Sequence, residues 1–323
     1  MEKRKLIKFG SNSFVISLPR DWIAANKLKK GADLYLDEKP GSITVTPSSF
    51  STEQKHAYLP CDGKTLQDIE IELLGYYKTN YSTFTIEGKT LPEHTAALKA
   101  LLSNLTGVEI IEQHRTKIVA KDLLDVRQVT LPVLITRMDM MIRSMFQDAL
   151  GEEEVSPDVL RERDRDVNRL HLLISRTVRG VYESPALGNI LAVTPLDASY
   201  IGQVAWSLER VADYIKRIDD DMLRSPKNDR VVIKQLLKIS FEQYLLTMKA
   251  YVKGDAELAV KTHADVLSQL TELTRHVLST TRKDALLALE NIKNVHRDLR
   301  IILRATIERP DVFFKDQERP RVG

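Results

Sequence analysis

The sequence predicts a multidomain α+β protein, because the spacing of its apolar residues changes twice along the chain. Between residues 5 and 47, short apolar runs alternate with turn residues, which is the pattern of short strands. Residues 51–127 mix strand and helix patterns, and from residue 131 to residue 310 apolar residues recur every three or four positions. We therefore expect domains over 1–50, 51–127 and 128–310, followed by a tail over 311–323.

The first domain is predicted to be a β-β-α-β-β unit. Phe14, Ile16 and Leu18 alternate with Val15 and Ser17 in FVISL, a strand pattern that a proline then ends. The segment DWIAANKL reads as a short helix, and KKGAD and KPGS supply turns. Stability is marginal below about 40 to 60 residues without a metal, a disulfide or a partner chain. A homodimer is therefore expected.

The middle domain is predicted to be a small α/β module. Helical patterns occupy LQDIEIELLGYYKT and PEHTAALKALLSNLTG, and Pro92 lies near the first turn of the second, where proline is tolerated. Strand patterns occupy YSTFTIEG, VEIIEQ and TKIVAKD. These segments alternate closely enough to form one sheet with helices on it.

The third domain is predicted to be all helical. Leu208, Val211, Ile215 and Ile218 mark one apolar face that must be covered, which favours a bundle or two three-helix bundles side by side. The second three helices begin about a hundred residues after the first three, which suggests a duplicated unit. The expected helices span 131–150, 157–183, 196–223, 229–252, 255–280 and 283–309.

Composition excludes several classes of protein. Cys61 is the only cysteine, so no internal disulfide or paired-cysteine zinc site is expected, and a reducing cytoplasm is favoured. No stretch of about 18 apolar residues occurs, which predicts a soluble protein without integral membrane insertion. Phosphate-loop, dinucleotide and nucleophile-elbow motifs are missing from the sequence, so we expect no enzyme activity.

Basic residues gather at the N-terminus, although the net charge of the whole chain is only +3. Four precede the turn at Gly10, and Arg20, Lys27, Lys29 and Lys30 follow the second strand. Such a surface predicts contacts with phosphates of double-stranded DNA, with strong salt dependence. Asn12, Ser13 and Arg20 are suited to base or sugar contacts, although Asn12 and Ser13 also suit a plain turn. The predicted DNA-binding residues are Lys3, Arg4, Lys5, Lys8, Asn12, Ser13 and Arg20.

The string RKLIKFGSNSFVISLPRDWIAANKLKKGADLYL resembles the swapped-hairpin domain of the AbrB/MazE/SpoVT group. Its basic first strand, the turn at Gly10, the strand ending in Leu18-Pro19, Trp22 and Gly31 carry the resemblance. The resemblance implies a β-barrel interleaved from two chains, with a basic DNA-binding face.

Two acids on the third predicted helix could share a cation. Glu209 and Asp213 are spaced i, i+4, so they project from one face one turn apart. The segment LERVAD resembles the acidic motif of the PhoU family, whose bundle consists of two three-helix repeats. That resemblance implies a divalent or ferric metal site at Glu209, Asp213 and Asp164. The alternative is a salt-bridged helix face with Arg210, Arg163 or Arg165.

The second half matches this motif less well. Asn168 already stands in the first half where the PhoU family usually has its next aspartate, and in the second half Glu290 is followed at i+4 by Asn294, with only Asp265 and Glu272 on the facing helix. A complete metal cluster is therefore not expected there.

The order of hairpin, module and bundle resembles an archaeal class of PhoU-related regulators. This implies a homodimeric transcriptional regulator linked to phosphate homeostasis, with the helical domain as sensor or platform for a phosphate-signalling protein. The alternative is a PhoU-like adaptor for a phosphate transporter or histidine kinase, whose hairpin only dimerises. An antitoxin of the MazE type is disfavoured, because about 270 patterned residues follow the hairpin where a short disordered tail would be expected.

Overall fold

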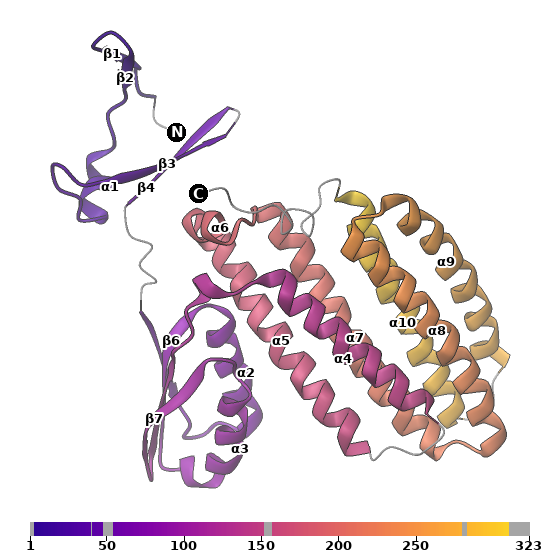
Figure 1. Cartoon of the computed structure of the whole chain (residues 1–323). Coiled ribbons are helices and arrows are strands. Elements are labelled where there is room, and N and C mark those ends of the chain that lie inside the picture. The colour runs from indigo at the N-terminus through magenta and orange to yellow at the C-terminus, as the bar shows by residue number, and fades with distance from the viewer. Residues whose placement is uncertain (1–2, 40, 48–53, 152–156, 280–282, 310–323) are drawn as a thin grey trace. The chain divides into compact units, whose positions relative to one another are not determined.

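A computed structural model describes residues 3–39, 41–47, 54–151, 157–279 and 283–309, and the chain divides into two compact units (Figure 1). Unit 1 comprises Met1–Glu53 and unit 2 comprises Gln54–Gly323. The predicted multidomain α+β class is confirmed, with small sheets first and a helical region after them. No helix within these ranges is long and apolar enough to cross a bilayer. The predicted tail, 311–323, lies outside the described residues.

Unit 1 follows the predicted β-β-α-β-β order and consists of two antiparallel hairpins joined by a short helix. The turns at Gly10 and Gly41 have φ values of 71° and 86°, which glycine adopts without strain. Ile7 pairs with Val15 and Leu34 with Pro47, so each hairpin has a defined register. The elements are β1 (Ile7–Phe9), β2 (Ser13–Val15), α1 (Arg20–Ala25), β3 (Leu34–Lys39) and β4 (Ser42–Pro47).

The apolar side chains of unit 1 have no core to enter. None of its residues whose burial is described is buried. Strand β2 ends at Val15, whereas the alternation predicted a strand through Leu18, because no described strand pairs with the residues beyond Val15. The large apolar side chains that are 41–69% exposed are Leu6, Ile7, Phe9, Phe14, Val15, Ile16, Tyr35, Leu36 and Ile43.

Unit 2 begins with a four-stranded sheet in the order β5-β6-β8-β7, in which only the β5–β6 pairing is parallel. The predicted helices and strands of this module are confirmed, but β5 was missed. Its apolar signal is only two residues, Ala57 and Leu59, buried between exposed His56 and Tyr58. The elements are β5 (Lys55–Pro60), α2 (Leu66–Lys78), β6 (Tyr81–Glu87), α3 (Leu91–Ser103), β7 (Val108–His114) and β8 (Lys117–Asp122).

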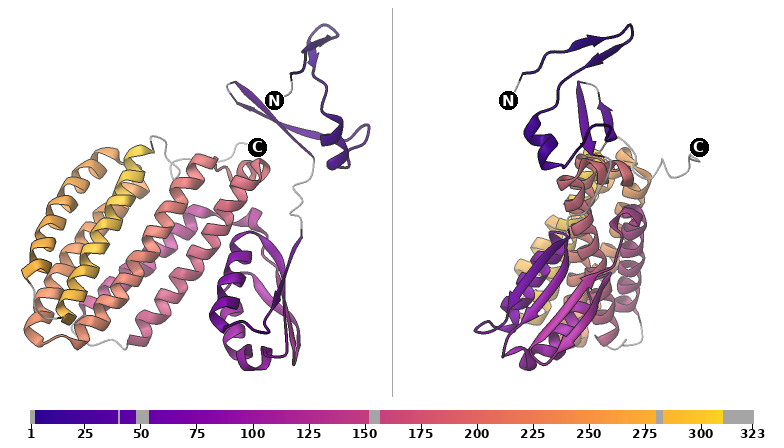
Figure 2. Two further views of the ribbon diagram at one scale, coloured as in Figure 1. Left: turned by 180° about the vertical axis from the view of Figure 1, so that it is seen from behind. Right: turned by 90° about the vertical axis from the view of Figure 1, so that its left-hand side faces the viewer.

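Helix α2 begins at a capping box. The Thr65 hydroxyl accepts a hydrogen bond from the backbone N–H of Asp68 at 3.2 Å, and the Asp68 carboxylate accepts one from the N–H of Thr65 at 3.0 Å. Helices α2 and α3 cover one face of the sheet, and α2 also packs against the helix over Pro157–Glu183 (Figure 2). The module therefore has its own apolar core and is attached to the helices beside it.

The six predicted long helices are confirmed, with ends within two residues of the expected positions. The stretch ESPALGN was expected to be a break, but it contains the short helix α6. Ser184 caps this helix by accepting from the N–H of Leu187, and Ala192 ends it in the left-handed conformation. The elements are α4 (Leu131–Leu150), α5 (Pro157–Glu183), α6 (Pro185–Leu191), α7 (Pro195–Arg224), α8 (Lys227–Lys253), α9 (Ala256–Ser279) and α10 (Lys283–Glu308), preceded by a 3₁₀ turn over Val126–Gln128.

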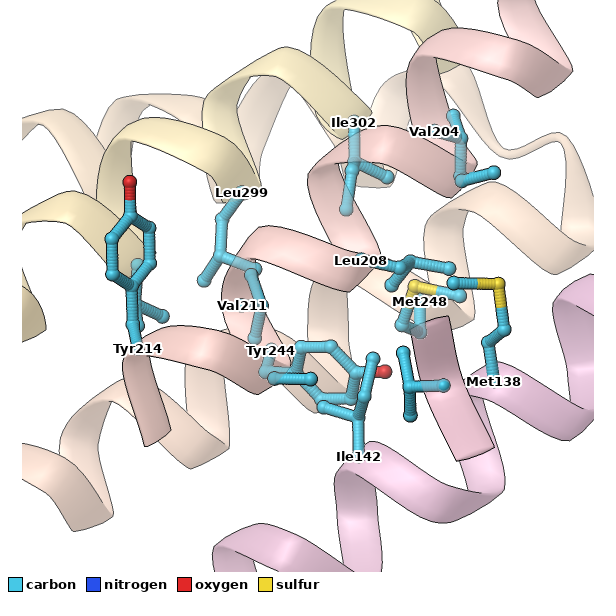
Figure 3. Packing of buried hydrophobic residues seen from close by; sticks show 14 of the residues in the cluster. Met138, Ile142, Val204, Leu208, Val211, Tyr214, Tyr244, Met248, Leu299 and Ile302 are labelled. Carbon is cyan, nitrogen blue, oxygen red and sulfur yellow. The ribbon is translucent and has the colours of Figure 1, made fainter. Parts of the chain in front are cut away.

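Helices α7 and α10 pack along each other in the middle of the helical region. Helices α4 and α5 pack on α7, and α8 and α9 pack on α10. Leu208 and Val211 of α7 are fully buried with Leu299 and Ile302 of α10 in one apolar cluster (Figure 3). This seam joins the first three long helices to the last three.

Shortening a side chain in this seam is predicted to destabilise unit 2. Leu208→Ala removes buried methyl groups and leaves a cavity, so we expect the free energy of unfolding to fall by about 2–5 kcal/mol. The control is Met140→Ala on α4, because Met140 is 64% exposed and its replacement should cost less than about 0.5 kcal/mol. Urea unfolding followed by circular dichroism measures both, and equal losses would contradict the assigned packing.

Candidate nucleic-acid interface and acidic cluster

The β1–β2 hairpin places the predicted DNA-binding residues on exposed positions. Lys5 precedes β1, Lys8 lies opposite Phe14, and Asn12 lies in the turn. Ser13, expected at the loop tip, instead opens β2 and pairs with Phe9. The side chains of these residues are exposed, so they are accessible to a polyanion.

The remaining basic residues of unit 1 lie before and after this hairpin. Arg20 begins α1, and Lys27 and Lys29 follow it, all with exposed side chains. Lys3 and Arg4 precede β1 and are also exposed, with Arg4 Nη1 donating to Ser17 Oγ at 3.3 Å. Residues 1–30 contain eight basic and two acidic residues, a net charge of +6, whereas the whole chain has +3. The net positive charge of this protein is therefore concentrated in residues 1–30.

The acids predicted to bind metal do come together, around a lysine. The Nζ atom of Lys216 lies 2.6 Å from Asp164 Oδ2 on α5 and 2.9 Å from Asp213 Oδ1 on α7. Arg217 Nη2 lies 2.5 Å from the other oxygen of Asp213. Lys216, Asp164 and Asp213 are each less than a quarter exposed. Two of the three carboxylates are therefore neutralised by cations of the chain itself.

The third acid, Glu209, lies one turn before Asp213 and is largely buried. Burial raises the pKa of its carboxyl group, and the negative charges of Asp213 and Asp164 raise it further. Lys216 and Lys78 act in the opposite direction. The pKa of the Glu209 carboxyl group therefore lies above its ordinary value.

The donor set does not fit a bare divalent ion. Among the residues that the structure describes, no three His, Cys, Asp or Glu side chains are grouped to hold a metal. Carboxylate oxygens suit a hard cation, but here the ammonium of Lys216 already lies between two of them. In the second half Glu290 pairs with Lys293 at 2.6 Å and with Arg297 at 3.4 Å. Metal binding at Glu209, Asp213 and Asp164 remains a prediction from the resemblance.

Arg210 does not compensate the neighbouring acids, although it lies between them in the sequence. Its Nε donates to Asp298 Oδ2 of α10 at 3.1 Å and its Nη2 donates to Tyr214 Oη at 2.6 Å. Its guanidinium also lies over the Trp206 ring, 4.5 Å from the centroid. Burial raises the pKa of Asp298 to about 6, although Arg210 opposes this. Arg210 therefore links α7 to α10 through its hydrogen bond with Asp298.

A buried ion pair attaches the α/β module to the bundle. Arg176 of α5 donates to Asp122 at the end of β8, and both side chains are about 5% exposed or less. The guanidinium lies over the ring of Tyr77 of α2, 4.7 Å from its centroid. Removing one partner of such a pair costs about 3–5 kcal/mol, because it leaves a buried charge. This ion pair and ring contact therefore hold α5 against the module.

The buried histidines and the cysteine behave as packing residues. The pKa of His171 is lowered to about 4 by burial and by Lys78, and the pKa of His296 is lowered to about 4 by burial. His296 Nε2 lies 2.9 Å from Ser240 Oγ. Cys61 is buried in the core of the module.

Comparisons of the chain with protein-family models, with curated proteins and with solved structures found no match.

Removing the internal cation is predicted to create a metal site. In Lys216→Met the carboxylates of Asp164 and Asp213 lose their shared ammonium, so a hard divalent ion becomes the favourable counter-charge. Millimolar Mn²⁺ should therefore raise the melting temperature of this variant by more than it raises that of wild type. Lys238→Met removes an exposed lysine of α8 and is the control. An equal Mn²⁺ effect in wild type would contradict the assigned role of Lys216.

The buried carboxyl group of Asp298 is predicted to make stability depend on pH. Its pKa is about 6 in the folded chain and 3.8 ordinarily, so the folded state binds more protons between these values. The free energy of unfolding should fall by about 2 kcal/mol as pH rises from about 4 to about 6. Urea titrations across this range should show the decrease in wild type and not in Asp298→Asn. Parallel profiles of the two proteins would exclude this carboxyl group as the cause.

Proposed function

We propose that the chain is a homodimeric, cytoplasmic DNA-binding transcriptional regulator linked to phosphate homeostasis. The observation that carries the proposal is that unit 1 combines a net charge of +6 over residues 1–30 with nine large exposed apolar side chains. The charge suits a nucleic acid and the apolar side chains suit a second protein surface. Both requirements are met when two copies of unit 1 form one body.

The apolar argument favours a second copy of unit 1 as the partner. Each large apolar side chain contributes about 1.5–3 kcal/mol when it leaves water, so the exposed set cannot be compatible with a stable isolated unit. Two short hairpins that lack a core can interleave strands and bury these side chains together. This is the swapped-hairpin barrel that the resemblance to the AbrB/MazE/SpoVT group implies.

The charge argument favours double-stranded DNA as the ligand. Lys3, Arg4, Lys5, Lys8 and Arg20 would contact phosphates, and a dimer would double the number of such contacts. Asn12 and Ser13 would approach base or sugar edges from the turn and the first position of β2. No described carboxylate pairs with Lys5, Lys8 or Arg20, so their charges are available for this role.

The helical region would serve as the regulatory part and as a platform for a phosphate-signalling protein. Its two successive sets of three long helices are compatible with the duplicated PhoU-like bundle that the resemblance implies. Arg176, Asp122 and Tyr77 supply a rigid connection from α5 to the α/β module, through which a partner on the bundle could act. Because Lys216 neutralises the acidic cluster, we favour regulation through a protein partner over regulation through a bound metal.

Charge reversal in the hairpin tests the DNA-binding proposal. Lys5→Glu and Arg20→Glu should each weaken binding to duplex genomic fragments at least about tenfold, because each reverses a charge at the phosphate backbone. Wild-type affinity should fall steeply between about 50 and 200 mM salt. Lys253→Glu, at the exposed C-terminus of α8, is the matched control and should bind as wild type does. Gel-shift titrations measure these affinities.

Two outcomes would overturn parts of the proposal. If both hairpin variants bind DNA as tightly as wild type, unit 1 is not the DNA-binding element. If wild type is a dimer by analytical ultracentrifugation but binds no duplex at low salt, the hairpin only dimerises. The chain is then better described as an adaptor for a phosphate transporter or a histidine kinase.

A further inference from the structure

Two arginines and a histidine on the outer side of α9 and α10 form a positive cluster. Arg300 and Arg304 are one turn apart on α10, and Arg300 Nε donates to Nε2 of His263 on α9 at 3.4 Å. This hydrogen bond requires a neutral imidazole that carries its proton on Nδ1. Arg304 is exposed, and Arg300 and His263 are half-buried, so solvent ions can reach the cluster.

The neighbouring cations of α10 have acidic partners, and these two arginines have none in the part of the chain that the structure describes. Lys293 and Arg297 both pair with Glu290, and Arg309 at the helix end lies 3.9 Å from Asp197. No carboxylate of the described residues forms an ion pair with Arg300 or Arg304. The positive charge without an acidic partner is therefore confined, on this part of α10, to Arg300 and Arg304 beside His263 of α9.

The positive charges of Arg300 and Arg304 repel each other. Like charges at i and i+4 on a helix repel and destabilise it. Burial lowers the pKa of His263, and the guanidiniums of Arg300 and Arg304 lower it further, while no acid offsets them. An anion between the three side chains would relieve the repulsion and allow the imidazole to be protonated as a further donor.

We propose that His263, Arg300 and Arg304 bind a phosphate-type oxyanion. A guanidinium presents paired N–H donors that match two oxygens of a tetrahedral anion, and two guanidiniums from one helix face can grip it together. His263 Nε2, released from Arg300, would donate to a third oxygen after protonation. The anion is either free inorganic phosphate or a phosphoryl group on a larger molecule, since the same atoms recognise both. The site lies in unit 2, so the proposal does not depend on DNA binding by unit 1.

A histidine-resolved titration tests the site in the full-length chain. Inorganic phosphate is added to protein with isotope-labelled histidine at constant ionic strength, with sodium chloride as the balancing salt. The His263 signal, assigned by its loss in His263→Gln, should shift saturably, and phosphate should raise its pKa. Arg300→Gln and Arg304→Gln should each weaken the fitted affinity at least about fivefold, because each loses a charge-assisted contact.

Arg297→Gln is the matched control. It removes an exposed arginine from the same helix, but one that already pairs with Glu290, so phosphate affinity should stay as in wild type. Titration with O-phosphoserine distinguishes the sources: equal affinity indicates recognition of any phosphoryl group, and much weaker affinity indicates the free ion. The proposal is overturned if chloride alone reproduces the shift of His263. It is also overturned if Arg297→Gln weakens phosphate binding as much as Arg304→Gln does.

Discussion

Burial of the apolar seam between α7 and α10 is the constraint on which the rest of the helical region depends. Leu208 and Val211 on one helix and Leu299 and Ile302 on the other exclude water along the line where the two sets of three helices meet. Because neighbouring positions on the same helices point elsewhere, the seam also determines where the charged residues lie. Glu209 and Asp213 face α5, while Arg300 and Arg304 face outward beside α9.

Unit 1, in contrast, has no buried apolar side chains among its described residues. Its strands pair correctly, yet hydrogen bonds between two short strands stabilise little when both faces remain in water. The exposed apolar side chains of β1, β2 and β3 are thus a stability deficit within a single chain. In the homodimer that we propose, a second copy would cover these apolar side chains and double the basic surface at the same time.

Several charged side chains of the bundle pair with a side chain of opposite charge nearby. Lys216 lies between Asp164 and Asp213, and Lys293 and Arg297 share Glu290, so acids in both halves are compensated by the chain's own cations. Arg176 and Asp122 form a deeply buried pair and hold the module to α5. The anion site that we propose lies beside His263, where no described carboxylate pairs with Arg300 or Arg304.

The sequence by itself determined the class of fold, the order of elements and the long helices, because apolar periodicity and capping residues act locally along the chain. It missed β5, since two buried residues in a six-residue strand give little signal, and α6, since a seven-residue helix that contains glycine is too short to show a clear apolar period. Helical spacing predicted that Glu209 and Asp213 share a face, and the resemblance to the PhoU family added Asp164 to the same cluster. Only the tertiary structure decided that Lys216, and not Arg210, compensates them, and that Arg300 meets His263. Which side chains meet across two helices depends on how those helices pack. The spacing of residues within one helix carries no information about that packing.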